Sequence, residues 1–239
     1  TASLMISPQK QIWHCFGCGE GGDIFGFVMR YENLEFREAL QQLAQRAGVT
    51  LPTYSPQAGQ DKKVSEDLVR ISNFASKFYH KQLMASSGAS ATALKYLQDR
   101  GLNEKTIENW EIGYAPDSFD ALIKALQAKQ VTSVNALLGG VVAKNDRGNI
   151  YDRFRDRITF PIHNYFGDVV GFSARVMPGA KGTVSESSAK YINSPDTPIY
   201  NKSKVLFGLY QAKAAIRKAD EAVVVEGQMD AISAHQAGF

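Results

Sequence analysis

The sequence has 239 residues, 44% of them hydrophobic and 21% charged, which is enough to bury a core and excludes an intrinsically disordered chain. No run approaches the roughly 18 consecutive apolar residues of a membrane span, so a membrane role is not expected. The only two cysteines, Cys15 and Cys18, are too close together to staple a fold of this size. A reducing, cytoplasmic location is therefore expected, and the start TASLMISPQK has the character of a cut end without a signal peptide.

The net charge of +3 is distributed unevenly along the chain. Residues 1–143 are neutral overall, residues 144–218 carry a net charge of +7, and residues 219–239 carry −4. A basic block directly before an acidic segment is typical of a phosphate-binding surface beside a cation site. Chance clustering of solvated charges is the alternative.

The first predicted elements surround the cysteine pair. The glycine-rich run HCFGCGEGGDIFGFVM predicts a knuckle that leads into a helix capped by Asp23, and NLEFREALQQLAQRAGV predicts a second helix that Asn33 caps and Gly48 ends. The spacing Cys15-x-x-Cys18 is that of half a tetrahedral zinc site. A redox pair is disfavoured by the following GEGG, and a structural turn without metal remains an alternative.

The next segment, residues 52–64, is polar and contains two prolines, which predicts an interdomain linker. Residues 65–84 predict a long amphipathic helix with Leu68, Ile71, Ala75 and Phe78 on one face. Shorter helices are expected to continue to about Leu138.

From Val141 the hydrophobic period changes from 3.6 to 2, which predicts an antiparallel β region through VVAKNDRGNIYDRF, RITFPI and VVGFSARV. A Gly/Ser-rich loop, MPGAKGTVSESSA, and an irregular segment, YINSPDTPIYNKS, follow. A helix through LFGLYQAKAAIRKA, a short apolar strand, AVVVEG, and a helix through QMDAISAHQAGF then predict the opening of an α/β unit.

Basic residues recur through this region. Strand periodicity places Arg153, Arg155 and Arg157 on one face of a single strand, where three like charges favour an anionic ligand such as a polyphosphate. The alternative is an edge strand that its charges protect from aggregation. The basic series continues with Arg175, Lys190, Lys202 and Lys204.

Two carboxylates stand at the end of the chain. Glu226 ends the predicted apolar strand and Asp230 lies in the first turn of the following helix, an arrangement that suits part of a Mg²⁺ site at the carboxyl edge of a sheet. A helix cap at Asp230 and a solvated strand end at Glu226 are the alternative.

Several long motifs together resemble, in order, bacterial replicative DNA primases of the DnaG type: SPQKQIWHCFGCGEGGDIFGFVM, YLQDRGL, YDRFRDRITFPI, VVGFSARV, KYINSPDTPIYNKS, LFGLYQA and VVVEGQMD. The resemblance covers nearly the whole chain and implies an α+β and α/β architecture. It implies part of a zinc ribbon with its following helices in residues 1–51 and a linker in 52–64. Residues 65–218 would form the mixed helical and antiparallel β subdomain of the RNA polymerase core, and 219–239 the start of a Toprim domain.

The resemblance also implies roles for particular residues. Cys15 and Cys18 match the second ligand pair of the zinc ribbon; the first pair would fall before Thr1, so His14 is not expected to be a ligand. Glu226 and Asp230 match the first Toprim motif, whose later Asp-x-Asp would lie beyond Phe239. The positions that match the basic template and nucleotide groove of the family are Arg100, Arg153, Arg155, Arg175, Lys190 and Lys202.

The function implied is that of a DNA-directed RNA polymerase, a nucleotidyltransferase that makes short primers, with structural Zn²⁺ and catalytic Mg²⁺ or Mn²⁺. The implied partners are a single-stranded DNA template, ribonucleoside triphosphates and a replicative helicase, and these 239 residues alone are expected to be inactive. A non-catalytic nucleic-acid-binding or recombination-mediator protein with a zinc knuckle and a Toprim segment is the alternative. The run YDRFRDRITFPI followed by KYINSPDT favours the primase. Trp13 and Phe16 could stack on bases or form the core of the knuckle.

Overall fold

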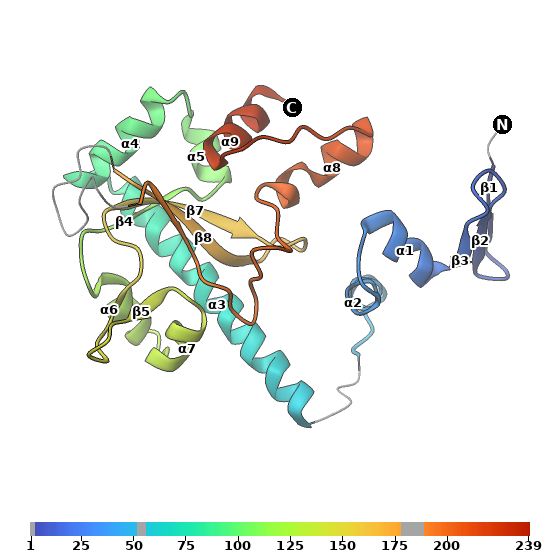
Figure 1. The fold of residues 1–239 in the computed structure, drawn as a ribbon, viewed down its shortest axis with the longest axis horizontal. Helices are drawn as coiled ribbons and strands as arrows, with labels where there is room; N and C mark the ends of the chain where they lie inside the picture. The colour runs from blue at the N-terminus through green and yellow to red at the C-terminus, as the bar shows by residue number, and fades with distance from the viewer. Residues whose placement is uncertain (1–2, 52–55, 178–188) are drawn as a thin grey trace. The chain divides into compact units, whose positions relative to one another are not determined.

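The computed structural model describes residues 3–51, 56–177 and 189–239 and shows a chain of helices and antiparallel sheets, as predicted (Figure 1). The chain divides into two compact units, residues 1–59 and 60–239. The division falls between Gly59 and Gln60, within the segment predicted to be a linker.

The first unit is a small sheet followed by two helices. Strands β1 (Leu4–Ser7), β2 (Ile12–Cys15) and β3 (Gly21–Asp23) pair antiparallel in the order β1-β2-β3, and α1 (Ile24–Glu32) and α2 (Phe36–Ala47) follow. Strand β3 leads directly into α1. The turn that contains the cysteines is therefore fixed by the paired strands β2 and β3 on either side of it.

The caps of these helices agree with the sequence at two positions and differ at a third. The Asp23 carboxylate accepts from the Gly26 N–H at 2.8 Å, and Gly48 ends α2 with a φ of 65°, both as predicted. The prediction that Asn33 caps α2 is wrong, because Asn33 ends α1 in the left-handed conformation. Glu35 and Glu38 instead form a reciprocal capping box at the start of α2.

The helix α3 (Pro56–Met84) has 29 residues, crosses the division between the units and is the first element of the second unit. It begins before the predicted start at residue 65, so residues 56–64 of the predicted linker are helical, while residues 52–55 lie outside the described part of the chain. Pro56 occupies the first helical position, where its missing N–H costs nothing. The polar composition of this stretch therefore did not exclude a helix.

A four-stranded antiparallel sheet carries the centre of this unit. Its strands are β4 (Gly113–Ala115), β7 (Arg157–His163), β8 (Val169–Val176) and β9 (Tyr191–Asn193), in the order β4-β7-β8-β9, while β5 (Val142–Lys144) and β6 (Ile150–Asp152) form a separate hairpin. The predicted antiparallel region is thus confirmed, and most of the predicted loop MPGAKGTVSESSA, residues 178–188, lies outside the described residues. The shorter helices are α4 (Ala89–Asp99), α5 (Glu104–Asn109), α6 (Ala121–Gln127), α7 (Ser133–Leu138), α8 (Leu209–Ala219) and α9 (Gln228–Ala237).

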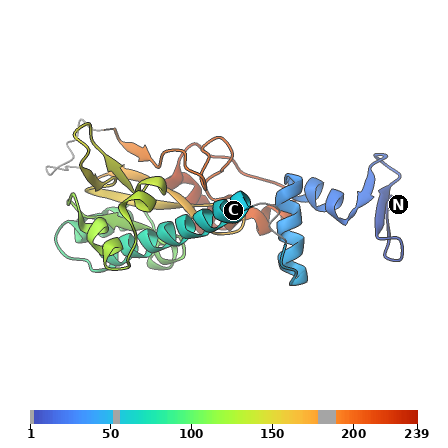
Figure 2. The same ribbon diagram turned by 90° about the horizontal axis from the view of Figure 1, so that it is seen from below.

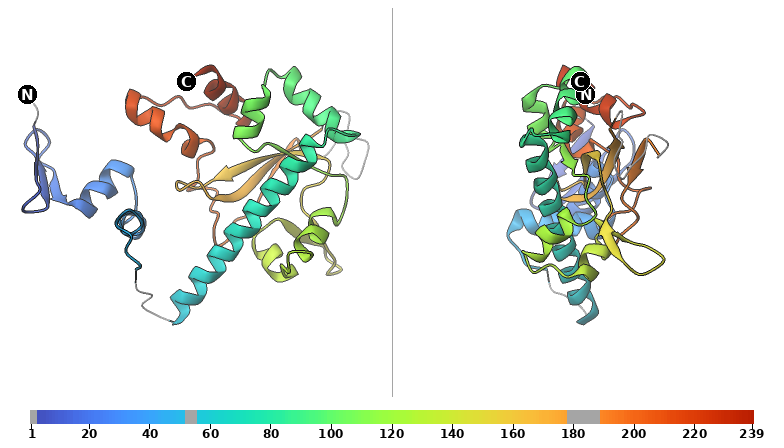
Figure 3. Two further views of the ribbon diagram at one scale, coloured as in Figure 1. Left: turned by 180° about the vertical axis from the view of Figure 1, so that it is seen from behind. Right: turned by 90° about the vertical axis from the view of Figure 1, so that its left-hand side faces the viewer.

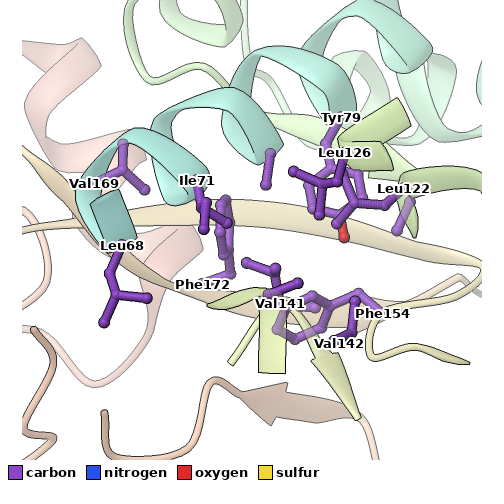
Figure 4. Close-up of a cluster of buried hydrophobic side chains, with 14 residues drawn as sticks. Leu68, Ile71, Tyr79, Leu122, Leu126, Val141, Val142, Phe154, Val169 and Phe172 are labelled. Atoms are coloured by element: carbon purple, nitrogen blue, oxygen red, sulfur yellow. The ribbon is translucent and has the colours of Figure 1, made fainter. Parts of the chain in front are cut away.

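One core lies between α3 and the sheet. Figures 2 and 3 show α3 crossing the sheet, and Figure 4 shows the buried side chains between them. Leu68, Ile71 and Ala75 are buried as predicted, but Tyr79, 1% exposed, is the fully buried aromatic residue of the helix where Phe78 had been expected. The Tyr79 ring meets the Phe172 ring of β8 edge to face at 5.7 Å.

The contact between α3 and β4 requires a glycine. A Cβ atom at Gly113 would stand 2.5 Å from the Tyr79 Cβ and 2.7 Å from the Thr159 hydroxyl. Any side chain at position 113 would therefore push the helix away from the sheet.

The second core lies under α4, α5 and α9. Met229 and Ile232 of α9 are buried in the same cluster as Leu97, Ile107 and Ile158. The apolar residues of the last helix are thus packed into the second core. The Gln236 side chain secures the helix further, because it accepts from the Asn103 N–H and donates to the Gly101 carbonyl.

The predicted apolar strand before α9 is not formed. Residues 221–225 have no strand pairing, and Val223 and Val224 are 68% and 81% exposed. A strand needs a neighbour to satisfy its backbone groups, and the described residues place none beside this segment.

The cap of α6 provides a test of the fold. The buried Asp152 carboxylate accepts from the backbone N–H groups of Leu122 and Ile123 at 2.7 and 3.0 Å. Asp152→Ala leaves both donors without a partner and should lower the free energy of unfolding by about 2 kcal/mol in urea denaturation. Asp120→Ala is the matched control, because Asp120 is exposed and makes no side-chain cap bond to α6. An equal loss in both variants would contradict the capping role of Asp152.

Candidate nucleic-acid interface

The cysteine pair lies in a tight turn after β2. The Cys15 N–H donates to the Glu20 carbonyl at 2.7 Å, and the Gly19 N–H donates to the Cys15 carbonyl at 2.9 Å. The backbone N–H of Cys18, the Ser3 hydroxyl and the backbone N–H of Gly17 lower the pKa of the Cys15 thiol to about 7. The turn therefore stabilises the thiolate, which is the form that binds zinc.

These two sulfurs fit half of a zinc site. Within the described part of the chain, no group of three or more His, Cys, Asp or Glu side chains lies close enough to hold a metal ion. His14 precedes Cys15 on β2, so strand alternation places the two side chains on opposite faces. The His14 ring lies against the Phe16 ring at 4.6 Å.

The two aromatic residues beside the cysteines differ in their surroundings. The Trp13 ring packs edge-on against Phe27 at 5.5 Å, and its Nε1–H donates to the Asp23 carbonyl at 3.0 Å. Phe16 is 71% exposed. Trp13 is thus core of the knuckle, and Phe16 is the ring that remains open to a base.

The arginines at 153, 155 and 157 do not share one strand face, so that prediction is wrong. β6 ends at Asp152 and β7 begins at Arg157, and the residues between them form an irregular bend in which Asp156 has a φ of 45°. The hydroxyl of Tyr114, a residue of β4, donates to the Asp156 carboxylate at 2.7 Å. This hydrogen bond attaches the bend to the sheet.

Arg157 belongs to the interior. It is 3% exposed and donates to the carbonyls of Ala174 at 3.3 Å and Ala189 at 3.0 Å. Its charge is used to satisfy backbone carbonyls, so it is not part of an exposed basic face.

Arg153 and Arg155 are half-buried on the bend. The Arg155 guanidinium lies over the rings of Phe119 and Tyr151, at 4.7 and 5.0 Å, and donates to the Asp152 carbonyl at 2.7 Å. Burial lowers the pKa of the Arg153 guanidinium. The Nε atoms of both arginines are buried without a hydrogen-bond partner in the described structure.

Arg175 lies on the other face of the sheet from Arg157. The register aligns Ile158, Arg175 and Tyr191 on one face of β7, β8 and β9, whereas Arg157 is paired with Val176. The Arg175 guanidinium lies 4.6 Å from the Tyr96 ring and 6.0 Å from the Tyr191 ring. It is 9% exposed, and its Nε and one terminal nitrogen have no partner within the described residues.

Arg100 joins this cluster through Tyr96. Arg100 ends α4, and its Nε donates to the Tyr96 hydroxyl at 3.1 Å. Burial raises the pKa of the Tyr191 phenol, the charges of Arg175 and Arg100 oppose the rise, and the Asp230 charge adds to it. The structure thus connects Arg100 and Arg175 through one tyrosine, Tyr96.

The two lysines of the predicted groove are exposed. Lys190 directly precedes Tyr191, and its carbonyl accepts from the Val176 N–H at 2.9 Å, which places it beside Arg175 at the edge of the sheet. Lys202 lies in the segment before α8, where its N–H donates to the Asp196 carboxylate at 2.9 Å. No described side-chain interaction connects Lys190 or Lys202 to the cluster around Arg175.

Glu226 and Asp230 stand on either side of the start of α9. Glu226 is exposed, and Asp230 folds back so that one carboxylate oxygen lies 2.9 Å from the point where a Cβ at Gly227 would stand. Asp230 makes no side-chain cap bond, so the alternative of a helix cap has no support in the described contacts. The two side chains supply oxygen ligands of the kind a hard cation takes, but they are too few for a complete site.

The sequence analysis did not single out the rings that hold these arginines: Tyr96, Tyr191, Phe119 and Tyr151. The spacing of Tyr96 and Arg100 was a usable signal, because residues four apart on a helix are neighbours. Tyr151 is also four residues from Arg155, but it precedes an irregular bend that no local pattern predicts. The contacts with Phe119 and Tyr191, and that between Arg175 and Tyr96, join residues distant in sequence.

Two family models match the two units of this chain. Residues 1–58 match the model of the CHC2 zinc finger, and residues 78–213 match that of the DNA primase catalytic core, N-terminal domain. The chain belongs to the DNA primase family of the DnaG type, as the motif resemblance predicted.

Relatives and solved structures agree with this assignment. The DNA primase of Halalkalibacterium halodurans is 41% identical over 239 residues, which is all of this chain and 39% of that protein. The RNA polymerase domain of Mycobacterium tuberculosis primase DnaG, in complex with a double-stranded DNA oligomer with a 6-nucleotide overhang, is 35% identical with a TM-score of 0.65, over 72% of this chain and 52% of that one. The zinc-binding and RNA polymerase domains of Aquifex aeolicus primase are 35% identical with a TM-score of 0.59, over 97% and 53% of the two chains.

The chain therefore spans well under half of the length of the curated relatives that it matches. Among the helices in the described ranges, none has both the length and the apolar character needed to cross a membrane.

The different surroundings of the arginines give a testable contrast. Arg153→Ala should weaken single-stranded DNA binding and reduce the salt dependence of log K by about 0.7 for each phosphate that is no longer bound. Arg157→Ala should instead lower the melting temperature, because it removes the donor to the buried Ala174 carbonyl and to the Ala189 carbonyl. Binding titrations over a salt series, with melting curves for both variants, make the comparison. An unchanged slope for Arg153→Ala would leave that residue with a structural role only.

The cysteine turn gives a second prediction. With two sulfur ligands in the described chain, the 239-residue polypeptide should bind zinc more weakly than a four-ligand ribbon, or share one ion between two molecules. Metal analysis together with the molar mass in solution measures this, and Cys15→Ser with Cys18→Ser is the control. A tight complex of one zinc with one monomer would show that further ligands in the chain complete the site.

Proposed function

We propose that this chain is part of an enzyme that synthesises short RNA primers on a single-stranded DNA template from ribonucleoside triphosphates. The observation that carries the proposal is that Arg100 and Arg175 both contact Tyr96 in a chain of the primase family. Two cationic side chains held together suit a site that binds phosphates, and Glu226 and Asp230 near the start of α9 supply oxygen ligands of the kind that a divalent cation takes.

The basic residues are assigned to the phosphates of template and nucleotides. The guanidinium groups of Arg155 and Arg175 are stacked on aromatic rings, so little side-chain freedom is lost when a phosphate binds. The unpartnered Nε atoms of Arg153 and Arg175 are donors of the type that phosphate oxygens accept. The full set assigned to this role is Arg100, Arg153, Arg155, Arg175, Lys190 and Lys202.

The acidic and sulfur ligands are assigned to metals. Glu226 and Asp230 would provide part of a Mg²⁺ or Mn²⁺ site, and Cys15 and Cys18 part of a structural Zn²⁺ site. When bound, the divalent cation neutralises negative charge on the reacting phosphate. Glu226 is also suited to accept the proton of the attacking 3′ hydroxyl, since it is an exposed carboxylate beside Asp230's helix.

The proposal extends to the organisation of the longer protein. Residues 1–51 would form the zinc-binding part, 52–64 the connection, 65–218 the template and nucleotide-binding part and 219–239 the first element of the catalytic Toprim domain. A replicative helicase is the proposed partner of the whole enzyme, acting in the cytoplasm.

A chimera tests the proposed activity. Residues 1–239 replace the matching segment of the Halalkalibacterium halodurans relative, and primer synthesis from ribonucleotides is measured on a single-stranded template with Mg²⁺ or Mn²⁺. The chimera should make primers and its Glu226→Gln and Asp230→Asn variants should lose at least about a hundredfold in rate, because charge neutralisation at the phosphate is removed. The isolated 239-residue chain should make none.

Two controls accompany this experiment. The unaltered relative sets the reference rate, and circular dichroism establishes that the chimera is folded. A folded chimera that binds single-stranded DNA without incorporating ribonucleotides would favour the non-catalytic mediator, and turnover by the isolated chain would show that the catalytic carboxylates lie elsewhere.

A further inference from the structure

Tyr96 contacts two of the proposed phosphate-binding arginines in different ways. Its ring lies under the Arg175 guanidinium at 4.6 Å, and its hydroxyl accepts from the Arg100 Nε at 3.1 Å. Arg175 belongs to β8 and Arg100 to the end of α4, so a single side chain connects a strand of the sheet with the helix that covers it.

Arg175 needs such a partner because it is 9% exposed and carries unpartnered nitrogens. A buried guanidinium is costly, and an aromatic face is the contact that stabilises its charge without occupying its N–H groups. A ring stacked on the guanidinium plane also leaves the N–H groups pointing sideways, in the plane where phosphate oxygens are bound. The Tyr96 ring therefore orients Arg175 and keeps its donors available.

Arg100 differs from Arg175 in being exposed, so its side chain can adopt many rotamers in water. The bond to the Tyr96 hydroxyl uses Nε alone and leaves the two terminal nitrogens for a ligand. Gly101, with a φ of 88°, ends the helix directly after Arg100 and so keeps Arg100 within reach of the last turn that holds Tyr96.

We infer that Tyr96 is a positioning residue that holds Arg100 and Arg175 as one phosphate-binding pair. The inference rests on the proposed function, since the pair is useful only if it receives a phosphate of template or nucleotide. The Tyr191 ring also lies near the Arg175 guanidinium, at 6.0 Å, and is thus a second, more distant aromatic contact.

The two contacts can be removed separately. Tyr96→Phe removes the hydroxyl and keeps the ring under Arg175, whereas Tyr96→Leu removes both. Single-stranded DNA binding by the 239-residue chain should weaken about threefold in Tyr96→Phe and about tenfold or more in Tyr96→Leu. Tyr165→Leu is the matched control, because the Tyr165 ring also stacks on a cation, Lys213, at 4.3 Å, outside the proposed pair.

Double-mutant cycles separate positioning from general stability. If Tyr96 acts through the arginines, Tyr96→Leu should cost much less in an Arg175→Ala background, and Tyr96→Phe much less in an Arg100→Ala background. Melting curves of every variant accompany the cycles. Tyr165→Leu should be additive with Arg175→Ala.

Each outcome is decisive. Additive losses in both Tyr96 cycles, with wild-type binding intact, would overturn the positioning role alone. Absence of salt-dependent binding by the wild-type chain would overturn the proposed function and this inference together. If Tyr96→Leu fails to fold, the cycle of Tyr96→Phe with Arg100→Ala decides, because it removes only a hydroxyl from a half-buried residue.

Discussion

The packing of α3 against the four-stranded sheet is the constraint on which the second unit depends. Gly113 lets the helix approach the sheet closely, and Tyr79 fills the contact with edge-to-face rings from β8 and from the bend before β7. Helix α3 covers one face of the sheet. The helices α4, α5 and α9 lie against the opposite face, where they form the second core. The arginine and tyrosine side chains are therefore placed by two layers of apolar packing before any ligand is present.

The charged residues of this unit follow from the same geometry. A sheet covered on both faces exposes few side chains, so a cation on its strands is buried and must find carbonyls or rings. A terminal nitrogen of Arg157 donates to two backbone carbonyls and only its Nε is buried without a partner in the described residues, whereas Arg175 lies over the Tyr96 ring and both its Nε and one terminal nitrogen are buried without a partner there. Two arginines that lie on neighbouring strands thus differ in their suitability for binding a phosphate.

Much of the secondary structure could be predicted from local signals, and the errors have physical causes. The cap at Asp23, the end at Gly48 and the period-2 runs depend on neighbouring residues and were confirmed. The segment of residues 221–225 was expected to be a strand because it is apolar, but strand formation depends on a partner that no local pattern contains. The bend at Asp156 was missed for a similar reason, since a buried hydroxyl from β4 holds it.

The sequence by itself determined the family, the cysteine turn, the basic character of residues 144–218 and the acidic pair near the start of α9, because these are properties of residue type and spacing. Only the tertiary structure decided which arginines donate to backbone carbonyls, which of them stack on tyrosine rings, and that Arg100 and Arg175 share the Tyr96 side chain. The physical reason is that burial and ring stacking act between elements far apart in the chain, and strand register, set by packing of the whole unit, brings those elements together.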